Sequence, residues 1–309
     1  MKRTLLVFTF LMICLAGFAQ AEPQQPQEPQ QPEYWTRNLN TQIGFSQVSL
    51  SNWAAGGFGS MSLNGYIDGN LIYEKDRFKW TNRLQMGYGF IQTYGEGFKK
   101  TDDRFILDMK AGYKAFDKFY ISAIYNFQTQ FGPGYKTVRG TDIISNAFAP
   151  AYTSLGIGID YTPSKNVSIN LSPLVAKVVM VKDPALRKKY GNEEDQFARV
   201  ELGAQLKFDG KVEIEDFSAG TTLTLFSDYL DHPLNIKVNW DVNISAKLTK
   251  FLAATIRTSL IYDDKIKHIE WKDKNGNVVL DKDGNPIMVP GVQFKELSSI
   301  SFSYTFGKK

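Results

Sequence analysis

The segment MSLNGYIDGNLIYEKDRFKWTNRLQMGYGF, residues 61–90, reads as two long strands around a short charged turn. Apolar and polar side chains alternate along both arms, which is the two-residue period of a β-strand. One face carries Met61, Leu63, Ile67, Leu71, Tyr73, Phe78, Trp80, Leu84, Met86, Tyr88 and Phe90, and the other carries Ser62, Asn64, Asp68, Asn70, Lys79, Thr81, Arg83 and Gln85. The segment therefore predicts a β-hairpin with one apolar and one polar face.

The same alternation recurs along the rest of the chain. No later segment has a sustained 3.6-residue apolar period or an apolar run of about 18 residues, so membrane-spanning helices are not predicted. With the two arms of the first hairpin, the pattern predicts twelve strands. The other ten lie near residues 39–45, 105–113, 119–127, 155–161, 167–171, 200–208, 221–229, 236–244, 252–262 and 300–306.

The predicted connections alternate between short and long. The short ones are residues 74–77, 116–118, 163–166 and 248–250, with a less clear one near 212–218. The long ones are residues 46–59, 93–103, 132–150, 182–198, 228–234 and 263–292. Short turns on one rim and long loops on the other are typical of outer-membrane barrels, and an even strand count places both chain ends on the short-turn side.

A closed barrel would also satisfy the backbone in a membrane, because hydrocarbon offers no partner to an open sheet edge. Aromatic residues near both ends of the strands, such as Trp80 and Tyr88, predict two interfacial belts. A soluble β-sandwich would show the same alternation. However, the polar faces are rich in Gly, Ser, Asn, Thr and Gln with charges of both signs, which suits an enclosed lumen. We therefore predict an all-β, transmembrane antiparallel up-and-down β-barrel of about 12 strands with short periplasmic turns and long extracellular loops.

The N-terminal residues 1–21, MKRTLLVFTFLMICLAGFAQA, have the basic start, apolar stretch and small-x-small site of a cleaved signal peptide. The Pro/Gln-rich residues 22–35 are predicted to be a periplasmic spacer, and residues 36–309 the barrel. The predicted location is the outer membrane of a Gram-negative cell. Cys14 is the only cysteine, so the mature chain would have no disulfide and no thiol nucleophile. Without Lys2 and Arg3, 34 basic and 32 acidic residues remain, a balance that gives no sign of nucleic-acid binding.

Four segments carry a resemblance to a known group. They are SLSNWAAGG (49–57), YKAFDKFYISAIYNFQTQFGPGY (113–135), LGIGIDYTPSKNVSINLSPL (155–174) and NWDVNISAKLTKFLAATIRTSLIYDD (239–264). With them, the chain from about Trp35 onward resembles an uncharacterised outer-membrane β-barrel family of Bacteroidota, a domain of unknown function. The resemblance implies a fold and a location, but no substrate and no catalytic residue.

The lumen is the leading candidate for a functional region. Both signs of charge occur among the residues predicted to point inward, so many are expected to pair across the interior. An arginine ladder that faced an acidic ladder would instead create a transverse field that selects polar solutes. Twelve strands lie between side-chain-filled barrels and open porins, which favours a filled or narrow interior. The predicted lumen residues are Arg83, Asp108, Lys110, Asp160, Glu201, Lys207, Lys237, Asp241 and Arg257.

Two features of the loops, with three residues between them, are weaker candidates. Trp53, just before Gly56 and Gly57, would be either a plug folded into the mouth or an ordinary interfacial tryptophan. Asp263 and Asp264, at the mouth of the eleventh strand, would bind a cation, gate a channel, or simply be solvated rim charges.

Two loop patterns have chemical alternatives. His232 beside Asp228 and Asp231 would be the base of a Ser–His hydrolase, but no motif marks a nucleophile, which favours a solvated loop histidine. Asp281, Asp283 and Asn285 loosely suggest a calcium loop, but Val292 replaces its bidentate glutamate, which favours two type I′ hairpin turns in a small β-meander. We predict no catalytic residue, metal or cofactor.

Together these patterns predict a narrow channel or transporter for small polar solutes, in contact with outer-membrane lipid. The alternative is a non-conducting barrel that docks envelope proteins. A membrane-embedded hydrolase using His232 is the less favoured alternative, and an enzyme is not expected.

Overall fold

The structure is a computed structural model that describes residues 34–49, 59–137 and 140–307. The predicted signal peptide, all but the last two residues of the spacer, and Trp53 lie outside the described residues. Within the described ranges, no helix has the length and apolar character needed to cross a membrane.

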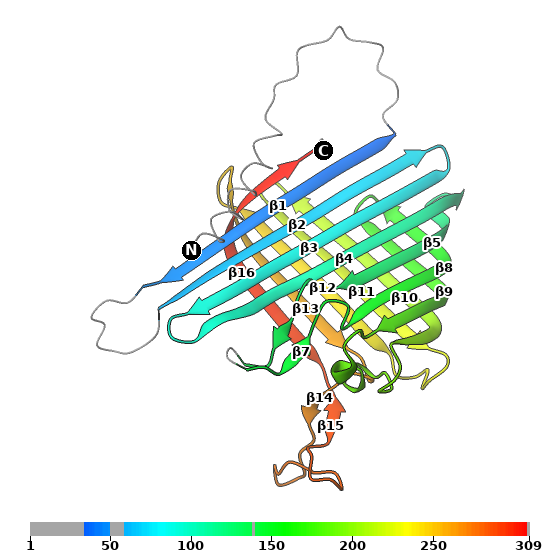
Figure 1. The fold of residues 1–309 in the computed structure, drawn as a ribbon. Helices are drawn as coiled ribbons and strands as arrows, with labels where there is room; N and C mark the ends of the chain where they lie inside the picture. The colour runs from blue at the N-terminus through cyan, green and yellow to red at the C-terminus, as the bar shows by residue number, and fades with distance from the viewer. Residues whose placement is uncertain (1–33, 50–58, 138–139, 308–309) are drawn as a thin grey trace. The chain divides into compact units, whose positions relative to one another are not determined.

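Twelve strands form one closed antiparallel sheet (Figure 1). Each strand pairs with its neighbours in the chain, apart from short excursions in the long loops, and β1 pairs with β16 to close the barrel. All twelve predicted strands are present, so the predicted fold class is confirmed. The strands are β1 (Trp35–Val48), β2 (Ser60–Lys75), β3 (Phe78–Thr93), β4 (Gly97–Phe116), β5 (Phe119–Thr129), β8 (Ala151–Ser164), β9 (Val167–Met180), β10 (Ala198–Ile214), β11 (Phe217–Asp228), β12 (Lys237–Lys247), β13 (Leu252–Tyr262) and β16 (Gln293–Phe306).

Short turns of two to four residues gather at one end of the barrel, the short-turn end, where β1 also starts and β16 ends. Asp76, Lys118 and Glu215 adopt positive φ in three of these turns, as tight hairpins require. One predicted loop is wrong. Residues 93–103 do not form a long loop, because β3 and β4 continue to pair as far as Thr93 and Gly97 and only Tyr94–Glu96 make the turn.

The long connections at the opposite, long-loop end carry small elements of their own. These are a two-stranded sheet of β6 (Gly134–Tyr135) and β7 (Ile143–Ser145), the 3₁₀ turns η1 (Pro184–Leu186) and η2 (Lys188–Tyr190), and a second small sheet of β14 (Lys267–Glu270) and β15 (Met288–Pro290).

The second small sheet starts an arm, residues 267–290, that has the predicted meander form. The backbone N–H of Val279 donates to the carbonyl of Trp271, and the N–H of Ile287 donates to that of Val279. Type I′ turns need positive φ at both central residues, whereas here only Gly276 and Gly284 have it. The predicted turn type is therefore wrong, although both turns exist.

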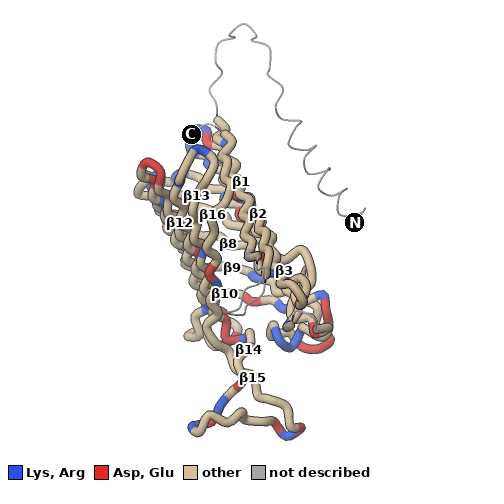
Figure 2. Tube along the Cα trace, turned by 90° about the vertical axis from the view of Figure 1, so that its left-hand side faces the viewer, with Lys and Arg blue, Asp and Glu red and all other residues tan. Residues whose placement is uncertain are grey.

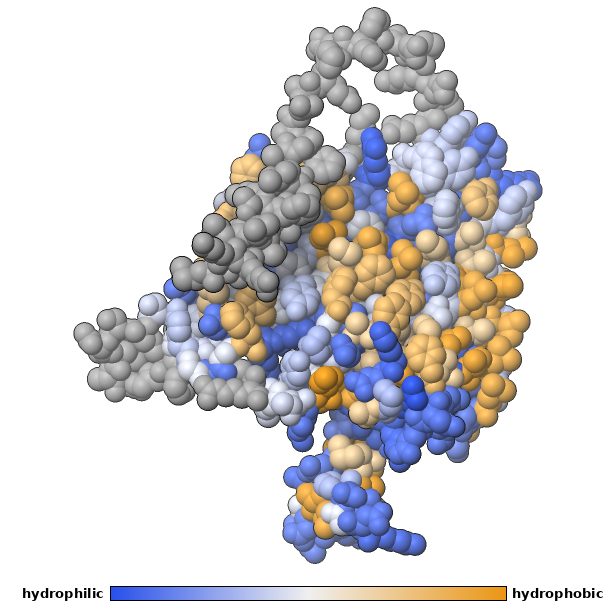
Figure 3. Space-filling view, in the orientation of Figure 1, coloured by the Kyte–Doolittle hydropathy of each residue, from blue (hydrophilic) through white to orange (hydrophobic). Residues whose placement is uncertain are grey.

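The outer wall of the barrel is apolar in the middle. On β8 the exposed fractions of Leu155, Ile157 and Ile159 are 57%, 58% and 55%, while Asp160, the residue after Ile159, points to the other face and is 4% exposed. In Figure 3 hydrophobic residues spread over the middle of the visible wall, and hydrophilic residues gather at its ends. Figure 2 shows charged residues concentrated at the turns and loops. An apolar band on a closed sheet is the surface of a transmembrane β-barrel.

Aromatic rings mark both edges of this band. At the short-turn end the ring of Trp35 lies 4.9 Å from that of Tyr73 and 6.3 Å from that of Trp80, centroid to centroid. At the long-loop end the rings of Phe105 and Phe127 lie 6.1 Å apart. The ring of Tyr88 at that end lies 6.5 Å from that of Phe131. Tyr and Trp prefer the membrane–water interface, and ring clusters that contain them mark both ends of the barrel, as predicted.

A β-bulge in the wall changes which residues of β9 point inward. Ile157 pairs with Leu174 and Ile159 with Leu171, so β9 has one more residue than β8 between these pairs. The backbones approach closely here, and a Cβ on Gly158 would lie 2.1 Å from the carbonyl oxygen of Leu171. The bulge therefore needs glycine at this position. Beyond the bulge, side chains of β9 that would otherwise point outward point inward, and those that would point inward point outward.

The seam between β1 and β16 is the shortest pairing in the barrel. It contains six register pairs, from Leu39–Phe306 to Gly44–Ser301. The other pairings of the barrel contain at least ten each, as between β13 and β16. Figure 1 shows the two strands together near the C-terminus and separating toward the long-loop end.

Candidate functional site: the charged lumen

Inward-pointing charges pair along neighbouring strands and across the interior. Arg83 on β3 holds Asp68 on β2 with two hydrogen bonds, Nη2 to Oδ2 at 2.7 Å and Nε to Oδ1 at 3.0 Å. This bidentate geometry is the strong form of a charged hydrogen bond. Asp68 was not among the predicted lumen residues.

Two lysines reach strands that are not their neighbours. Lys110 Nζ on β4 lies 2.9 Å from Asp160 Oδ2 on β8, with β5 between them, and also contacts Ser168 at 2.8 Å. Lys207 Nζ on β10 lies 3.0 Å from Asp108 Oδ1 on β4, with three strands between them. The second pair therefore crosses the interior from one wall to the other.

The densest group of charges, the outer cluster, lies toward the long-loop end around Glu201. Its carboxylate is fully buried and accepts hydrogen bonds from Lys237, at 2.6 Å, and from Arg199. Lys177 Nζ is 3.5 Å from the other carboxylate oxygen and also stands over the rings of Tyr152 and Phe226. A buried carboxylate is tolerated only when it is paired, and here cations surround it.

Asp263 joins this cluster, whereas Asp264 does not. Asp263 is 6% exposed, and its Oδ1 lies 3.2 Å from Lys237 Nζ. Asp264 instead accepts a hydrogen bond from Asn235 Nδ2 at 2.9 Å. The structure therefore places one of the two mouth carboxylates in the interior network and the other in a loop contact.

Lys265 links the outer cluster to the loop after β11. Its Nζ lies 3.1 Å from Asp228 Oδ2 and 3.1 Å from Asp231 Oδ2. Burial alone would lower the pKa of Lys265, but hydrogen bonds to Asp231 and Asp228 outweigh it and raise the pKa above its usual value. The hydrogen bond from Lys265 in turn lowers the pKa of Asp231.

The last two predicted lumen residues lie on β12 and β13. Asp241 accepts a hydrogen bond from Ser259 Oγ at 2.6 Å. Arg257 donates to Gln42 Oε1, and its guanidinium carbon lies 3.8 Å from the centroid of the Tyr66 ring. The nine predicted residues thus divide among separate contacts, and only Glu201 and Lys237 share the outer cluster.

Several charged residues that point into the interior were not predicted from the sequence. Lys177 has the same parity as the outward Leu171, but the bulge in β9 turns it inward. Asp102 was assigned to the predicted loop 93–103, and Arg104 lies just before the predicted strand 105–113. In the structure, β4 includes both residues. Their alternation with outward residues along Gly97–Phe116 is the signal that could have found them.

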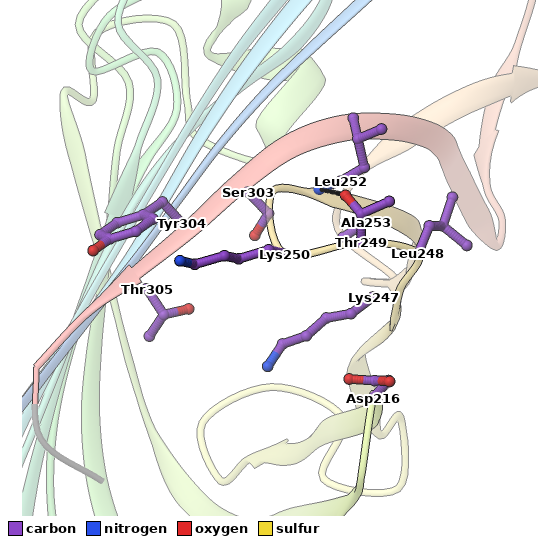
Figure 4. Close-up of a pocket in the computed structure, with 10 residues that line it drawn as sticks. All are labelled: Asp216, Lys247, Leu248, Thr249, Lys250, Leu252, Ala253, Ser303, Tyr304 and Thr305. Atoms are coloured by element: carbon purple, nitrogen blue, oxygen red, sulfur yellow. Dashed lines mark hydrogen bonds between the residues drawn. The ribbon is translucent and has the colours of Figure 1, made fainter.

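A cavity of about 470 Å³ opens at the short-turn end beside the β12–β13 turn (Figure 4). In the figure, the ammonium ends of Lys247 and Lys250 point into the same space as the hydroxyl of Thr305. Ser303 and Asp216 also line it. This mouth of the barrel is thus polar, with an excess of cations.

His232 and Asp281, considered above as a catalytic base and as part of a calcium loop, make local contacts within their loops. The His232 side chain is 75% exposed and contacts Asp231, while Asp228 is engaged by Lys265; within the described residues, no serine hydroxyl bonds to the ring of His232. Asp281 Oδ1 accepts from the backbone N–H groups of Asn285 and Asp283, both at 2.9 Å, and those bonds lower its pKa. Its carboxylate therefore caps a turn.

The comparisons with known proteins do not assign an activity to the chain. Residues 45–135 match a family described as "Protein of unknown function (DUF3078)". No curated protein sequence matches the chain significantly. An outer membrane channel from Pseudomonas putida F1 is similar in structure, with 12% identity, 90% of this chain and 100% of that chain covered, and a TM-score of 0.37.

Two further structures resemble the chain as remotely. The translocator domain of the autotransporter NalP from Neisseria meningitidis has 10% identity, covers 88% of each chain and gives a TM-score of 0.36. A porin has 7% identity, covers 87% of this chain and 100% of its own, and gives a TM-score of 0.30. Likenesses at this level carry no information about what passes through the barrel or binds to it.

Proposed function

We propose that the protein is an outer-membrane barrel whose lumen forms a narrow, charge-lined path for small polar solutes. The observation that supports this most directly is the Lys207–Asp108 pair, which joins β10 and β4 across three intervening strands at 3.0 Å. With Lys110–Asp160 it places ion pairs in the lumen, where they reduce the space left for a wide pore. Charged side chains at a constriction select solutes by charge and size.

The predicted signal peptide and the resemblance to a Bacteroidota barrel family support an outer-membrane location. In that arrangement the short-turn end, with the cavity lined by Lys247 and Lys250, faces the periplasm, and the arm faces outward. The cationic short-turn mouth and the paired lumen then form successive polar environments along one path.

Planar-bilayer recording of the purified, refolded protein tests the proposal. We expect a small conductance for the wild type and a several-fold larger one for the double variant Lys207→Met with Asp108→Asn, because the crossing pair is removed without leaving a buried charge unpaired. The control is Lys188→Met with Glu194→Gln, a pair in the loop between β9 and β10 whose side chains are 71% and 74% exposed, and its loss should leave the conductance unchanged. Silence of both the wild type and the lumen variant, with folding shown by gel mobility, would reject the channel.

The second candidate is a non-conducting barrel that docks envelope proteins, and the arm is the observation that favours it. Trp271, Leu280 and Met288 are 49%, 53% and 38% exposed on this projecting segment. Exposed apolar groups beyond the membrane band are characteristic of interaction surfaces. This candidate predicts silent bilayers for every lumen variant, and it predicts a partner that is lost when residues 271–287 are deleted.

A further inference from the structure

The β1–β16 seam leaves part of each strand without a partner on the seam side. Among the described residues, β1 beyond Gly44 pairs only with β2, and β16 before Ser301 pairs only with β13. The unpaired stretches are residues 45–48 and 293–300, which separate in Figure 1. Open backbone edges are costly against hydrocarbon, so this part of the wall calls for another kind of neighbour.

Arg257 lies directly behind the unpaired stretch. Its register partner on β16 is Leu297, in the middle of residues 293–300. From β13 its side chain reaches Gln42 on β1 and Tyr66 on β2, and it is only 6% exposed. The guanidinium thus lies inside the barrel against Gln42, two residues before Gly44, at which the pairing of the seam ends.

Among the described residues, the charge of Arg257 has no counter-ion. Other arginines of the lumen form ion pairs, as Arg83 does with Asp68 and Arg199 with Glu201. Arg257 forms none with any described carboxylate, and its buried Nε has no hydrogen-bond partner. A buried charge without a partner is costly, and a guanidinium offers a planar fork that matches an oxyanion.

The surroundings add to the positive charge. Arg104 and Lys295 both form ion pairs with the same carboxylate, that of Asp102, so two cations share one anion. On the outer face of β16, Ser298 donates to Glu296 Oε1 at 2.8 Å, so this face is polar between Phe294 and Ile300. A polar rim outside and excess positive charge inside would let a hydrated anionic group cross the wall here.

We propose that Arg257 binds the oxyanion, a carboxylate or phosphate, of an amphiphile whose apolar tail leaves the barrel sideways through the unpaired part of the seam. The inference goes beyond the axial path, because it gives the barrel a second, lateral route to the bilayer. The same oxyanion chemistry is available from a small anion in solution. The unpaired strand edges favour the amphiphile.

The ligand arm of the test uses parinaric acid, a fluorescent long-chain carboxylic acid, added to the purified barrel in a neutral detergent. We expect binding to the wild type, at least tenfold weaker binding to Arg257→Gln, and partial retention in Arg257→Lys. The Gln variant removes an uncompensated buried charge, so its folding should not suffer. The methyl ester of parinaric acid should bind weakly to every form, and the Lys188→Met/Glu194→Gln control should bind the acid like the wild type.

Two results of this assay would overturn the proposal. The first is equal affinity of the wild type and Arg257→Gln for parinaric acid. The second is displacement of parinaric acid by inorganic phosphate at comparable concentration, which would assign Arg257 to a soluble anion and remove the lateral route.

The seam arm uses disulfide formation, since the mature chain is predicted to lack cysteine. Asn40→Cys with Thr305→Cys places two thiols at a register pair, which should cross-link on oxidation. Ser46→Cys with Ser299→Cys would face each other only if the same register continued, so no cross-link is expected. Equal cross-linking of both pairs would show a closed seam and overturn the proposal. Disulfide-linked dimers of the second variant would assign the edge to another copy of the chain and overturn it as well.

Discussion

The wall around Glu201 and the seam around Arg257 are two solutions to the same problem, a charge buried inside a barrel. In the wall, β9 and β10 pair along most of their length and cations surround the carboxylate. At the seam, the pairing of the described residues stops after Gly44–Ser301, and Arg257 forms no ion pair with a described carboxylate. The charge in the wall is thus balanced by neighbouring cations, whereas the described residues at the seam provide neither a strand partner nor a counter-ion.

The difference has a physical consequence for rigidity. A buried carboxylate held by several cations favours a single arrangement of the strands around it, and Glu201 is held in this way although its Oε2 meets Lys177 only at 3.5 Å, without a hydrogen bond. Backbone groups without partners open at low cost, and binding sites are commonly drawn from such regions. The predictions below test whether the two regions differ in this way, beginning with the largest expected effect.

Glu201→Gln should be strongly destabilising. The substitution removes the charge that faces Lys177, Arg199 and Lys237, and breaking a buried ion pair by removing one partner costs about 3–5 kcal/mol. Urea unfolding of the barrel in lipid vesicles measures the loss. Glu74→Gln, which breaks the exposed pair with Lys79, should cost only about 0–1 kcal/mol. A similar small cost for Glu201→Gln would mean that the outer cluster does not hold the wall.

Hydrogen exchange should separate the two regions without any substitution. We expect backbone amides of residues 293–300 to exchange about 100-fold faster than those of residues 199–207, because they lack partners on one side and open locally. Mass spectrometry of peptides from the folded barrel gives both rates in one sample. Equal protection of the two stretches would contradict an open seam.

The strand count and the class of barrel follow from the two-residue alternation alone, since side chains of a strand must alternate between two faces. The hairpin of residues 61–90 illustrates this: Leu84 and Met86 point outward in the structure, while Arg83 points inward to Asp68. The alternation of residues 167–171, continued to Lys177, would turn that side chain outward, whereas one inserted residue in β9 reverses every side chain after it.

The candidate site is less accessible to sequence reasoning. Which charges meet across the interior depends on how far each strand is shifted against its neighbours, and alternation carries no information about that shift. Lys207 and Asp108 are 99 residues apart and meet only because three strands curve between them. The length of the β1–β16 pairing is equally invisible, since both strands alternate normally on either side of Gly44.

Alanine substitutions at two glycines compare the rigidity of the wall with that of the seam. A Cβ on Gly158 would lie 2.1 Å from the carbonyl oxygen of Leu171, which is backbone in the bulge, whereas a Cβ on Gly44 at the seam would meet only the amide end of Asn64, at 2.7 Å. Because a side chain can swing away and the bulge cannot, Gly158→Ala should cost about 1–3 kcal/mol and Gly44→Ala well under 1 kcal/mol. Urea midpoints in vesicles give both values, and the reverse order would show that the wall is the softer region.

The smallest expected effect concerns Lys265, which links the outer cluster to the loop after β11. Its pKa is raised by Asp231 and Asp228, so its contribution to stability is complete below the unfolded value of about 10.4 and is lost as the pH rises through the folded value. We therefore expect the thermal midpoint to fall slightly more steeply above about pH 10 in the wild type than in Lys265→Met. Lys267→Met, two residues along and outside these pairs, should keep the wild-type curve. Identical curves for the wild type and Lys265→Met would show that the loop contacts do not stabilise the folded barrel. The difference between wall and seam would then reside in the strands alone.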